Sequence, residues 1–396
     1  MSGILLTFNP GSSTIKLGLY RISGDTTERL GMGMIDLRRA PLGLHIAEGP
    51  SVADIPLRAK ITDDLHEVID ETLNWLTHHF GIEGIAAVGH RVVHGGDVFA
   101  GPVRIDDAAL EAIESFVHLA PLHQPRSLRL IGAIRHLRPD LPQTASFDTA
   151  FHRTQADLVR RFALPRAMFD EGIKRYGFHG LSYKFVAARL REVAPEFASG
   201  KVVAAHLGSG ASLCALENGE SRDTSMGFST LDGIPMATRC GSLDPGVVLH
   251  LLQQRRMSIE EVEDILYHKS GLFGVSGISA DSRDLLESDL PAAREAIGLF
   301  THRIAREIAA LATTFGGLDA VVFTAGIGEH QPIIRAAVCE RLSWLGVSLD
   351  GNANADNATR IHVTGSKVGV FVIPTNEEQV IATEAVEILN ASKEDR

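Results

Sequence analysis

Two stretches of this chain, about half its length apart, resemble each other, and this internal repeat constrains the fold more than any other feature. Residues 4–20 read I-L-L-T-F-N-P-G-S-S-T-I-K-L-G-L-Y, and residues 202–217 read V-V-A-A-H-L-G-S-G-A-S-L-C-A-L-E. In each stretch an apolar run meets one polar residue, Asn9 or His206, then a Gly/Ser turn and a second run. This pattern predicts two strands joined by the turn. We interpret the pair as a duplicated domain, with chance similarity as the alternative.

The rest of the chain alternates between helix-like and strand-like segments. Apolar spacing predicts helices over 63–80, 125–137, 181–193, 291–315 and 376–390. Short apolar runs predict buried strands over 85–93, 144–151, 319–324 and 368–373. Strands alternating with helices predict the α/β class, in which helices cover the sheets.

The length of 396 residues is more than one domain usually holds, and it predicts two large domains. We expect an N-terminal domain over 1–150 and a C-terminal, nucleotide-binding domain over 151–377. The closing helix, about 378–396, follows the second copy of the repeat, and we expect it to pack back on the first domain.

Composition and charge exclude several classes of function. The chain has 38 Lys and Arg against 49 Asp and Glu, for a net charge of −11, which argues against nucleic acid or an anionic membrane as its main partner. The three cysteines are far apart and odd in number, so neither a disulfide framework nor a structural zinc site is expected. No apolar run is long enough to span a membrane, and the start does not read as a signal peptide, so we expect a cytoplasmic protein.

Three glycine turns are candidate anion sites, because consecutive backbone N–H groups can form a concave anion pocket. The first is Gly11-Ser12-Ser13, followed by Lys16, and the second is at 206–210. The third, F-T-A-G-I-G-E-H at 323–330, lies between a predicted strand and a helix beginning near Pro332. It matches neither the P-loop nor the dinucleotide-binding pattern. Each could also be an ordinary turn.

Two arginines and two other residues lie in glycine-rich or strand-end loops. Arg91 occurs in G-H-R-V-V-H-G-G, and Arg239 in M-A-T-R-C-G-S-L-D-P. Asp148 ends the predicted strand at 144–151, and His179 occurs in Y-G-F-H-G. Arginine at such positions suits an oxyanion, because its planar guanidinium donates two parallel hydrogen bonds. A surface ion pair for each arginine, and a structural role for the histidine, are the alternatives.

These motifs together resemble the acetate kinase family. In family order the chain contains N-P-G-S-S-T-I-K, H-R-V-V-H-G-G, A-P-L-H-Q-P, S-F-D-T-A-F-H, R-Y-G-F-H-G, H-L-G-S-G-A-S, D-T-S-M-G-F, T-R-C-G-S-L-D-P, S-G-L-F-G-V-S-G, T-A-G-I-G-E and P-T-N-E-E, across residues 4–390. The resemblance implies the actin/Hsp70/sugar-kinase superfamily fold, with two duplicated, ribonuclease H-like domains around a nucleotide cleft. It also implies ATP or ADP as co-substrate, Mg²⁺ with Mn²⁺ as an alternative, and a homodimer.

The resemblance assigns roles position by position. It implies catalytic roles for Asp148, His179 and Arg239, and metal contacts for Asn9 and Glu377. It implies that the acid is bound by Arg91, Val93, Leu122 and Phe178. It implies a nucleotide site formed by Lys16, His206, Leu207, Gly208, Ser209, Gly210, Asp281, Ser282, Arg283, Gly326, Ile327, Gly328, Glu329 and His330.

Some positions depart from the family pattern. Ser209 and His330 stand where asparagine is usual, so they bear on nucleotide preference. Thr230 replaces a proline of the acyl pocket and bears on the choice between acetate and propionate. Tyr183 replaces a histidine, and Ser242 replaces an aspartate.

The implied reaction is Mg²⁺-dependent, reversible phosphoryl transfer between ATP and a short carboxylate, acetate first, giving acetyl phosphate and ADP. Such an acid, with a pKa near roughly 4.3, is already ionised at pH 7 and needs no base. Asp148 is therefore expected to organise metal or water rather than to accept a proton. Alternatives are a propionate or butyrate kinase, a pyrophosphate-using enzyme, and a regulatory ATP-binding module of the Hsp70/actin type.

Overall fold

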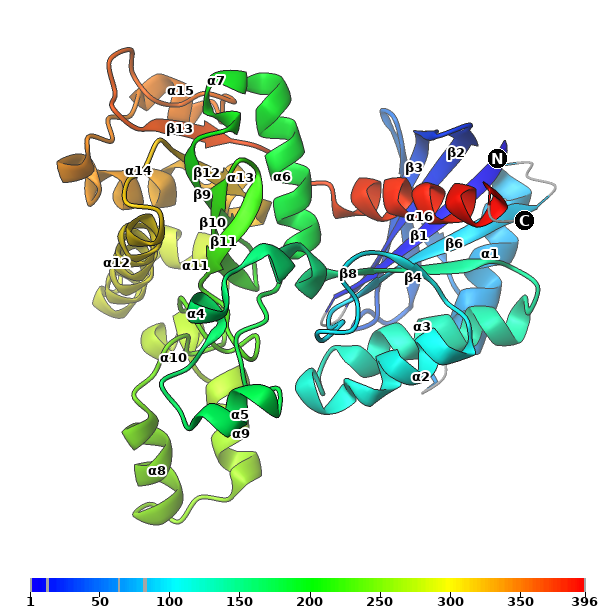
Figure 1. Ribbon diagram of the computed structural model, residues 1–396, viewed down its shortest axis with the longest axis horizontal. Helices are drawn as coiled ribbons and strands as arrows, with labels where there is room; N and C mark the ends of the chain where they lie inside the picture. The colour runs from blue at the N-terminus through cyan, green and yellow to red at the C-terminus, as the bar shows by residue number, and fades with distance from the viewer. Residues whose placement is uncertain (1, 12–13, 63–64, 81–83, 395–396) are drawn as a thin grey trace. The chain divides into compact units, whose positions relative to one another are not determined.

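The structure is a computed structural model of residues 1–396, and it describes residues 2–11, 14–62, 65–80 and 84–394. The chain forms two compact units (Figure 1). Unit 1 comprises Met1–Phe151 and Asn376–Arg396, and unit 2 comprises His152–Thr375. Both are of the α/β type, as predicted.

Unit 1 contains eight strands in one mixed sheet. Its strands are β1 (Ser2–Pro10), β2 (Thr14–Ser23), β3 (Thr26–Asp36), β4 (Gly43–Glu48), β5 (Ser51–Pro56), β6 (Ile85–Val92), β7 (Val103–Arg104) and β8 (Gln143–Phe147). Its helices are α1 (His66–His79), α2 (Asp107–Ser115), α3 (Gln124–Leu137) and α16 (Glu377–Glu394), with short 3₁₀ helices at Val117–Leu119 and Asp148–Thr154.

Unit 2 contains a five-stranded mixed sheet. Its strands are β9 (Lys201–Leu207), β10 (Ala211–Glu217), β11 (Glu220–Thr224), β12 (Ala320–Thr324) and β13 (Gly369–Val372). Its helices are α4 (Asp157–Arg160), α5 (Arg166–Asp170), α6 (Gly180–Val193), α7 (Pro195–Ala198), α8 (Pro245–Gln253), α9 (Ile259–His268), α10 (Gly271–Ser276), α11 (Ser282–Glu287), α12 (Pro291–Thr314), α13 (Ala325–His330), α14 (Pro332–Glu340) and α15 (Gly351–Ala355), with a 3₁₀ helix at Ser343–Leu345.

The five-stranded sheet of unit 2 repeats the order of five strands of unit 1, β3-β2-β1-β6-β8. In unit 1 the order is β5-β4-β3-β2-β1-β6-β8-β7, and in unit 2 it is β11-β10-β9-β12-β13. In each, the first strand pairs antiparallel with a hairpin partner and parallel with the strand after a helix. Asn9 and His206 lie near the carboxyl ends of these equivalent first strands. The shared order confirms the duplication read from the sequence.

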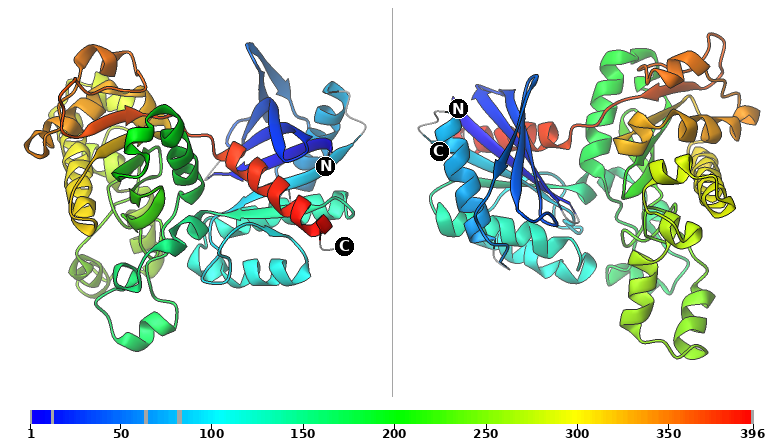
Figure 2. Two further views of the ribbon diagram at one scale, coloured as in Figure 1. Left: turned by 45° about the horizontal axis from the view of Figure 1, so that its top comes forward. Right: turned by 180° about the vertical axis from the view of Figure 1, so that it is seen from behind.

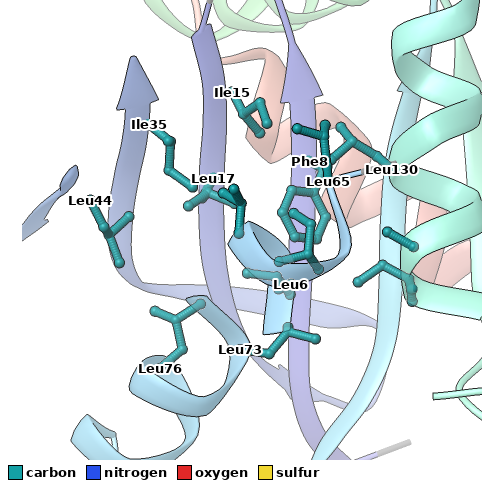
Figure 3. Close-up of a cluster of buried hydrophobic side chains, with 14 of the residues drawn as sticks. Leu6, Phe8, Ile15, Leu17, Ile35, Leu44, Leu65, Leu73, Leu76 and Leu130 are labelled. Carbon is teal, nitrogen blue, oxygen red and sulfur yellow. The ribbon is translucent and has the colours of Figure 1, made fainter. Parts of the chain in front are cut away.

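Helices cover both faces of the sheet of unit 1 (Figure 2). On one face, Leu6 and Phe8 of β1 pack with Leu73 and Leu76 of α1 and with Leu130 of α3 (Figure 3). Because side chains alternate along a strand, the neighbouring residue of β1 points to the other face.

That other face is covered by α16. Leu5 and Ala87 of the sheet pack there against Ala382 and Val386 of the helix. The last helix of the chain therefore completes the core of the first unit.

Two predicted segments differ from the structure. The predicted strand 144–151 ends at Phe147, and a 3₁₀ helix follows from Asp148, because the sheet ends there and the backbone must turn. The glycine turn expected at 326–330 is the short helix α13, in which the Glu329 carboxylate accepts a 2.7 Å bond from the N–H of Ala325. Of the first Gly/Ser turn, Ser12 and Ser13 lie outside the described residues.

Within the described part of the chain, no helix is long and apolar enough to cross a membrane.

Candidate functional site

In unit 1, strand ends bring four of the predicted site residues together. Asn9 lies near the end of β1, Arg91 near the end of β6, and Asp148 directly after β8, while Glu377 begins α16. Strands β1 and β8 flank β6 and run parallel to it, so their carboxyl ends lie at one edge of the sheet. The Arg91 Nε donates to Asp148 Oδ1 at 3.0 Å, and its Nη2 to Oδ2 at 2.6 Å.

Asn9 connects this ion pair to two carboxylates. Its Oδ1 accepts a 3.1 Å bond from Arg91 Nη1. Its Nδ2 donates to Glu377 Oε2 at 2.7 Å and to Glu378 Oε1 at 2.8 Å. Both glutamates are more than 90% buried. Glu378 was not among the predicted site residues, although the E-E doublet at the end of P-T-N-E-E was a signal for it.

The cluster holds Arg91 in its charged form. Burial acts to lower the pKa of Arg91, but the charges of Asp148, Glu377 and Glu378, with the hydrogen bond to Asp148, outweigh it and raise that pKa. Four of its five N–H groups are engaged, since Nη1 also donates to the carbonyl of Pro10 at 3.5 Å. Among the residues that the structure describes, none accepts from the second N–H of Nη2, which is left for a further acceptor.

In unit 2, His179 is held by a network of hydroxyl groups. It caps the start of α6 in the left-handed region, with φ of 57°. Its Nδ1 lies 2.8 Å from Ser212 Oγ, which is also 2.5 Å from the hydroxyl of Tyr183. The His179 ring stacks on that of His206 at 4.2 Å, and His206 Nδ1 lies 2.8 Å from Ser182 Oγ.

Arg239 lies beside the same histidine. A Cβ built on Gly210 would be 3.5 Å from His179 Nε2 and 3.7 Å from Arg239 Nη1, so both side chains converge on the glycine turn. Arg239 Nη1 donates to the carbonyl of Thr230 at 3.1 Å. Burial lowers the pKa of Arg239, and it makes no ion pair with any residue that the structure describes. A half-buried guanidinium without a carboxylate partner among the described residues is suited to binding an anion.

The turn at 206–210 also lies near the third glycine segment. A Cβ on Gly208 would be 3.7 Å from the Cβ of Ala325, which begins α13 with φ of 64°. At Gly326 a Cβ would meet no atom within 4 Å, so the space beside this glycine is open.

Of the predicted residues at 326–330, Glu329 makes structural hydrogen bonds. Glu329 Oε1 accepts bonds from the backbone N–H of Ala325 at 2.7 Å and of Thr375 at 3.0 Å. His330 is exposed, 3.8 Å from Glu329. Ile327 is half-buried and Gly328 is buried.

The predicted residues 281–283 lie near this segment too. Gln331, directly after α13, donates from Nε2 to Ser282 Oγ at 2.7 Å. Asp281 caps α11 by accepting from the N–H of Arg283, and the side chain of Arg283 pairs with the same carboxylate. Unit 2 thus brings together the predicted nucleotide residues of 206–210, 281–283 and 326–330.

The remaining predicted residues lie as follows. Lys16 is exposed and sits opposite Asn9 in the β1–β2 register. Leu207 and Val93 are buried, Ser209 is exposed, Leu122 is half-buried, and Phe178 is buried in unit 2. The hydroxyl groups of Ser182 and Ser212 were missed, because a serine in an alternating strand or a helix start carries no distinctive pattern.

The chain is similar to known proteins in sequence and in fold. A model described as the Acetokinase family matches residues 4–383. An acetate kinase of Rhodopseudomonas palustris strain CGA009 is 48% identical over 390 residues, covering 96% of this chain and 97% of that protein. One of Methylocella silvestris is 44% identical over 400 residues, covering 98% and 99%.

Two solved structures match in fold as well. A propionate kinase of Francisella tularensis has a TM-score of 0.89 at 34% identity and covers 97% of this chain and 99% of that one. An acetate kinase of Porphyromonas gingivalis has a TM-score of 0.86 at 32% identity and covers 98% and 100%.

Proposed function

Because this chain belongs to the acetate kinase family, we propose that it transfers a phosphoryl group between ATP and acetate, forming acetyl phosphate and ADP, and that the two clusters described above perform the transfer. The assignment of residues rests on Arg239, a partly buried guanidinium without a carboxylate partner among the described residues, beside His179 and a glycine turn.

The main barrier to this reaction is charge repulsion. Two unit charges 4 Å apart repel by about 1 kcal/mol in water and by about 4 kcal/mol at an effective dielectric near 20. An acetate anion approaching a triphosphate meets several such charges. Guanidinium groups offset this repulsion at the transition state, and one positioned arginine can raise the rate roughly 10³- to 10⁵-fold.

Arg239 and His179 contact the phosphoryl group as it moves. The guanidinium supplies charge, and the histidine ring is oriented for a hydrogen bond because Ser212 holds its Nδ1. Arg91 binds the acid. Since Asp148, Asn9 and the carbonyl of Pro10 already hold four of its N–H groups, it meets the substrate carboxylate through the remaining Nη2–H unless Asp148 releases it.

Asp148 acts by positioning. It is 1% exposed, and both of its oxygens bind Arg91, so it orients that guanidinium before the acid arrives. The acid is ionised at neutral pH, so no proton has to be removed from it.

We propose that oxygen ligands of unit 1 hold the magnesium ion. Glu377 and Glu378 converge on Asn9, and together with Asp148 they place three carboxylates near one guanidinium. Mg²⁺ prefers such hard oxygen ligands, carried by one or two carboxylates with water and substrate phosphates. We assign Asn9, Glu377 and Glu378 to it, directly or through water. When bound, the ion supplies positive charge to the phosphate oxygens.

ATP binds to unit 2 in this proposal. The segments 206–210, 281–283 and 326–330 supply backbone N–H groups and glycine surfaces, and the open space at Gly326 admits the nucleotide.

Acetate is the proposed acid, with propionate as the second candidate because a propionate kinase shares the fold. The family pattern assigns Val93, Leu122 and Phe178 to the choice of acid, and Thr230 to the ranking of acids. A kcat/KM series over C2–C4 acids decides, and a preference for propionate or butyrate would overturn the choice of acetate. One methylene changes binding by only about 1–3 kcal/mol, so overlap is expected.

A homodimer is proposed through α8. Every residue of this helix is at least partly exposed, and Val247 and Leu249 are 41% and 53% exposed. An exposed apolar helix of this kind needs a covering surface, and a second copy is the proposed one. A monomer in light scattering would refute it.

A hydroxamate assay with acid, ATP, Mg²⁺ and hydroxylamine tests the function. We expect Arg239→Ala to lose most of kcat, on the order of 10³-fold, and Arg91→Ala mainly to raise the KM for the acid. Arg189→Ala, which removes an exposed arginine paired with Glu192, is the matched control and should be unchanged. Wild-type kcat/KM in both test variants would refute the roles, and no acyl phosphate from any short acid would favour a regulatory ATP-binding module.

A further inference from the structure

Unit 1 contains a cavity of about 290 Å³ that the proposed reaction does not use. It lies where the end of β1 meets α1 and α3. Its inner wall belongs to the hydrophobic core, with Ile15, Leu65 and Leu130 all at least 94% buried (Figure 3). A volume of this size is near the lower end of the range for small-molecule sites, about 300–1,000 Å³.

The outer wall of this cavity is basic. Arg38, Arg126 and Arg129 line it, and its described lining contains no carboxylate. Arg38 is paired with Asp36, whereas Arg129 is exposed and makes no ion pair in the part of the chain that the structure describes. Burial, and then the charge of Arg129, lower the pKa of Arg126. Two guanidiniums thus repel each other at the mouth of an apolar cavity without a counter-charge among the described lining residues.

The cavity also touches the backbone at the end of β1, the strand that carries Asn9. Pro10 and Gly11 line it and directly follow Asn9. The carbonyl of Gly11 accepts a 2.9 Å bond from Arg126 Nη1, and the carbonyl of Pro10 accepts the weaker bond from Arg91. A ligand that draws Arg126 toward itself therefore competes with a bond that holds this end of β1.

We propose that this cavity is an effector site for a small amphipathic anion, whose carboxylate or phosphate binds Arg126 and Arg129 and whose apolar part fills the space against Ile15, Leu65 and Leu130. An apolar wall alone would accept a neutral ligand equally well, and the guanidiniums alone would accept inorganic phosphate. Only the combination selects for both properties. Occupancy changes the rate of the kinase through Pro10 and Gly11.

Calorimetric titration of the full chain with octanoate, octyl phosphate and 1-octanol tests the site. We expect both anions to bind at least ten-fold more tightly than octanol, with the stronger one identifying the preferred head group. Arg129→Ala should weaken anion binding at least ten-fold, a change of about 1.4 kcal/mol. Arg135→Ala is the matched control, since Arg135 lies on the same helix, is paired with Asp107 and does not line the cavity.

A competition experiment distinguishes binding in the cavity from binding at the reaction site. Saturating acetate should leave octanoate binding unchanged, whereas displacement by acetate would place octanoate at the reaction site and overturn the proposal. Equal binding by wild type and Arg129→Ala, or equal binding of octanol, would also overturn it.

The effector role has its own readout. At saturating octanoate, we expect kcat or the KM for acetate to change at least two-fold in wild type and Arg135→Ala, but not in Arg129→Ala. Anion binding without any such change would overturn the effector role.

Discussion

Removal of Arg91 should destabilise unit 1 strongly, because it leaves Asp148 buried without its charged partner. Asp148 is 1% exposed, and both of its oxygens accept bonds from Arg91, at 3.0 and 2.6 Å. Breaking one side of a buried ion pair costs roughly 3–5 kcal/mol. For a unit of about 170 residues, each kcal/mol lowers Tm by roughly 2–4 °C. Arg91→Met should therefore lower the Tm of unit 1 by about 6–20 °C.

The chain offers a fluorescence probe for this unit. It has two tryptophans, of which Trp75 is in α1 of unit 1 and Trp344 is 72% exposed in unit 2. In a Trp344→Phe background, thermal unfolding followed by tryptophan emission reports on unit 1. A matched control is Arg21→Met, which breaks an exposed pair with Glu28 in the same sheet and should cost less than about 1 kcal/mol.

The double variant Arg91→Met/Asp148→Asn separates charge from packing. With the buried carboxylate neutralised, we expect it to regain more than half of the lost Tm. A single variant within about 2 °C of its parent, or a double variant that loses as much as the single one, would refute the argument that losing the Arg91 charge beside the buried carboxylate causes the loss.

Three further predictions concern other parts of the molecule. Gly89→Ala would place a Cβ 2.8 Å from Ile381 Cγ2, so it should loosen α16 at a cost of roughly 1–3 kcal/mol, seen as faster hydrogen exchange over 377–391. Ser212→Ala removes the bond to His179 Nδ1, so kcat should fall about ten-fold with Tm within a few degrees of wild type; an unchanged kcat would contradict the positioning role. Burial lowers the pKa of His90, His94 and His152 from 6.5 to about 4. Between these pH values the unfolded state binds more protons than the folded state, so the free energy of unfolding should fall as pH drops from about 6.5 toward 4. Urea unfolding at pH 5 should show a loss of about 2 kcal/mol per histidine.

The helices and buried strands were the most predictable features. The expected helices 181–193 and 291–315 correspond to α6 and α12, and the expected strand 85–93 to β6. These helices bury one face and this strand is buried over most of its length, so the spacing of their apolar residues predicts them. Strands β3–β5 were not predicted. Strand β5 lies at the edge of the sheet, and most of its residues and many of those in β3 are exposed, so neither strand carries a long apolar run.

Local chemistry at the candidate site was harder to anticipate. The motifs singled out Arg91 and Asp148 separately, but the bond between them joins residues 57 positions apart. Likewise, the contact of Asn9 with Glu378 spans 369 positions. No local pattern encodes such pairs.

By itself, the sequence determined the α/β class, the internal repeat and the family, because short-range periodicity and local motifs carry this information. Only the tertiary structure decided which charges are paired. It joined Arg91 to Asp148, left Arg239 without an acidic partner among the described residues, and placed Arg126 and Arg129 around an apolar cavity. Such pairings depend on which strand ends and helices meet in space, and desolvation then sets how strongly each charge acts.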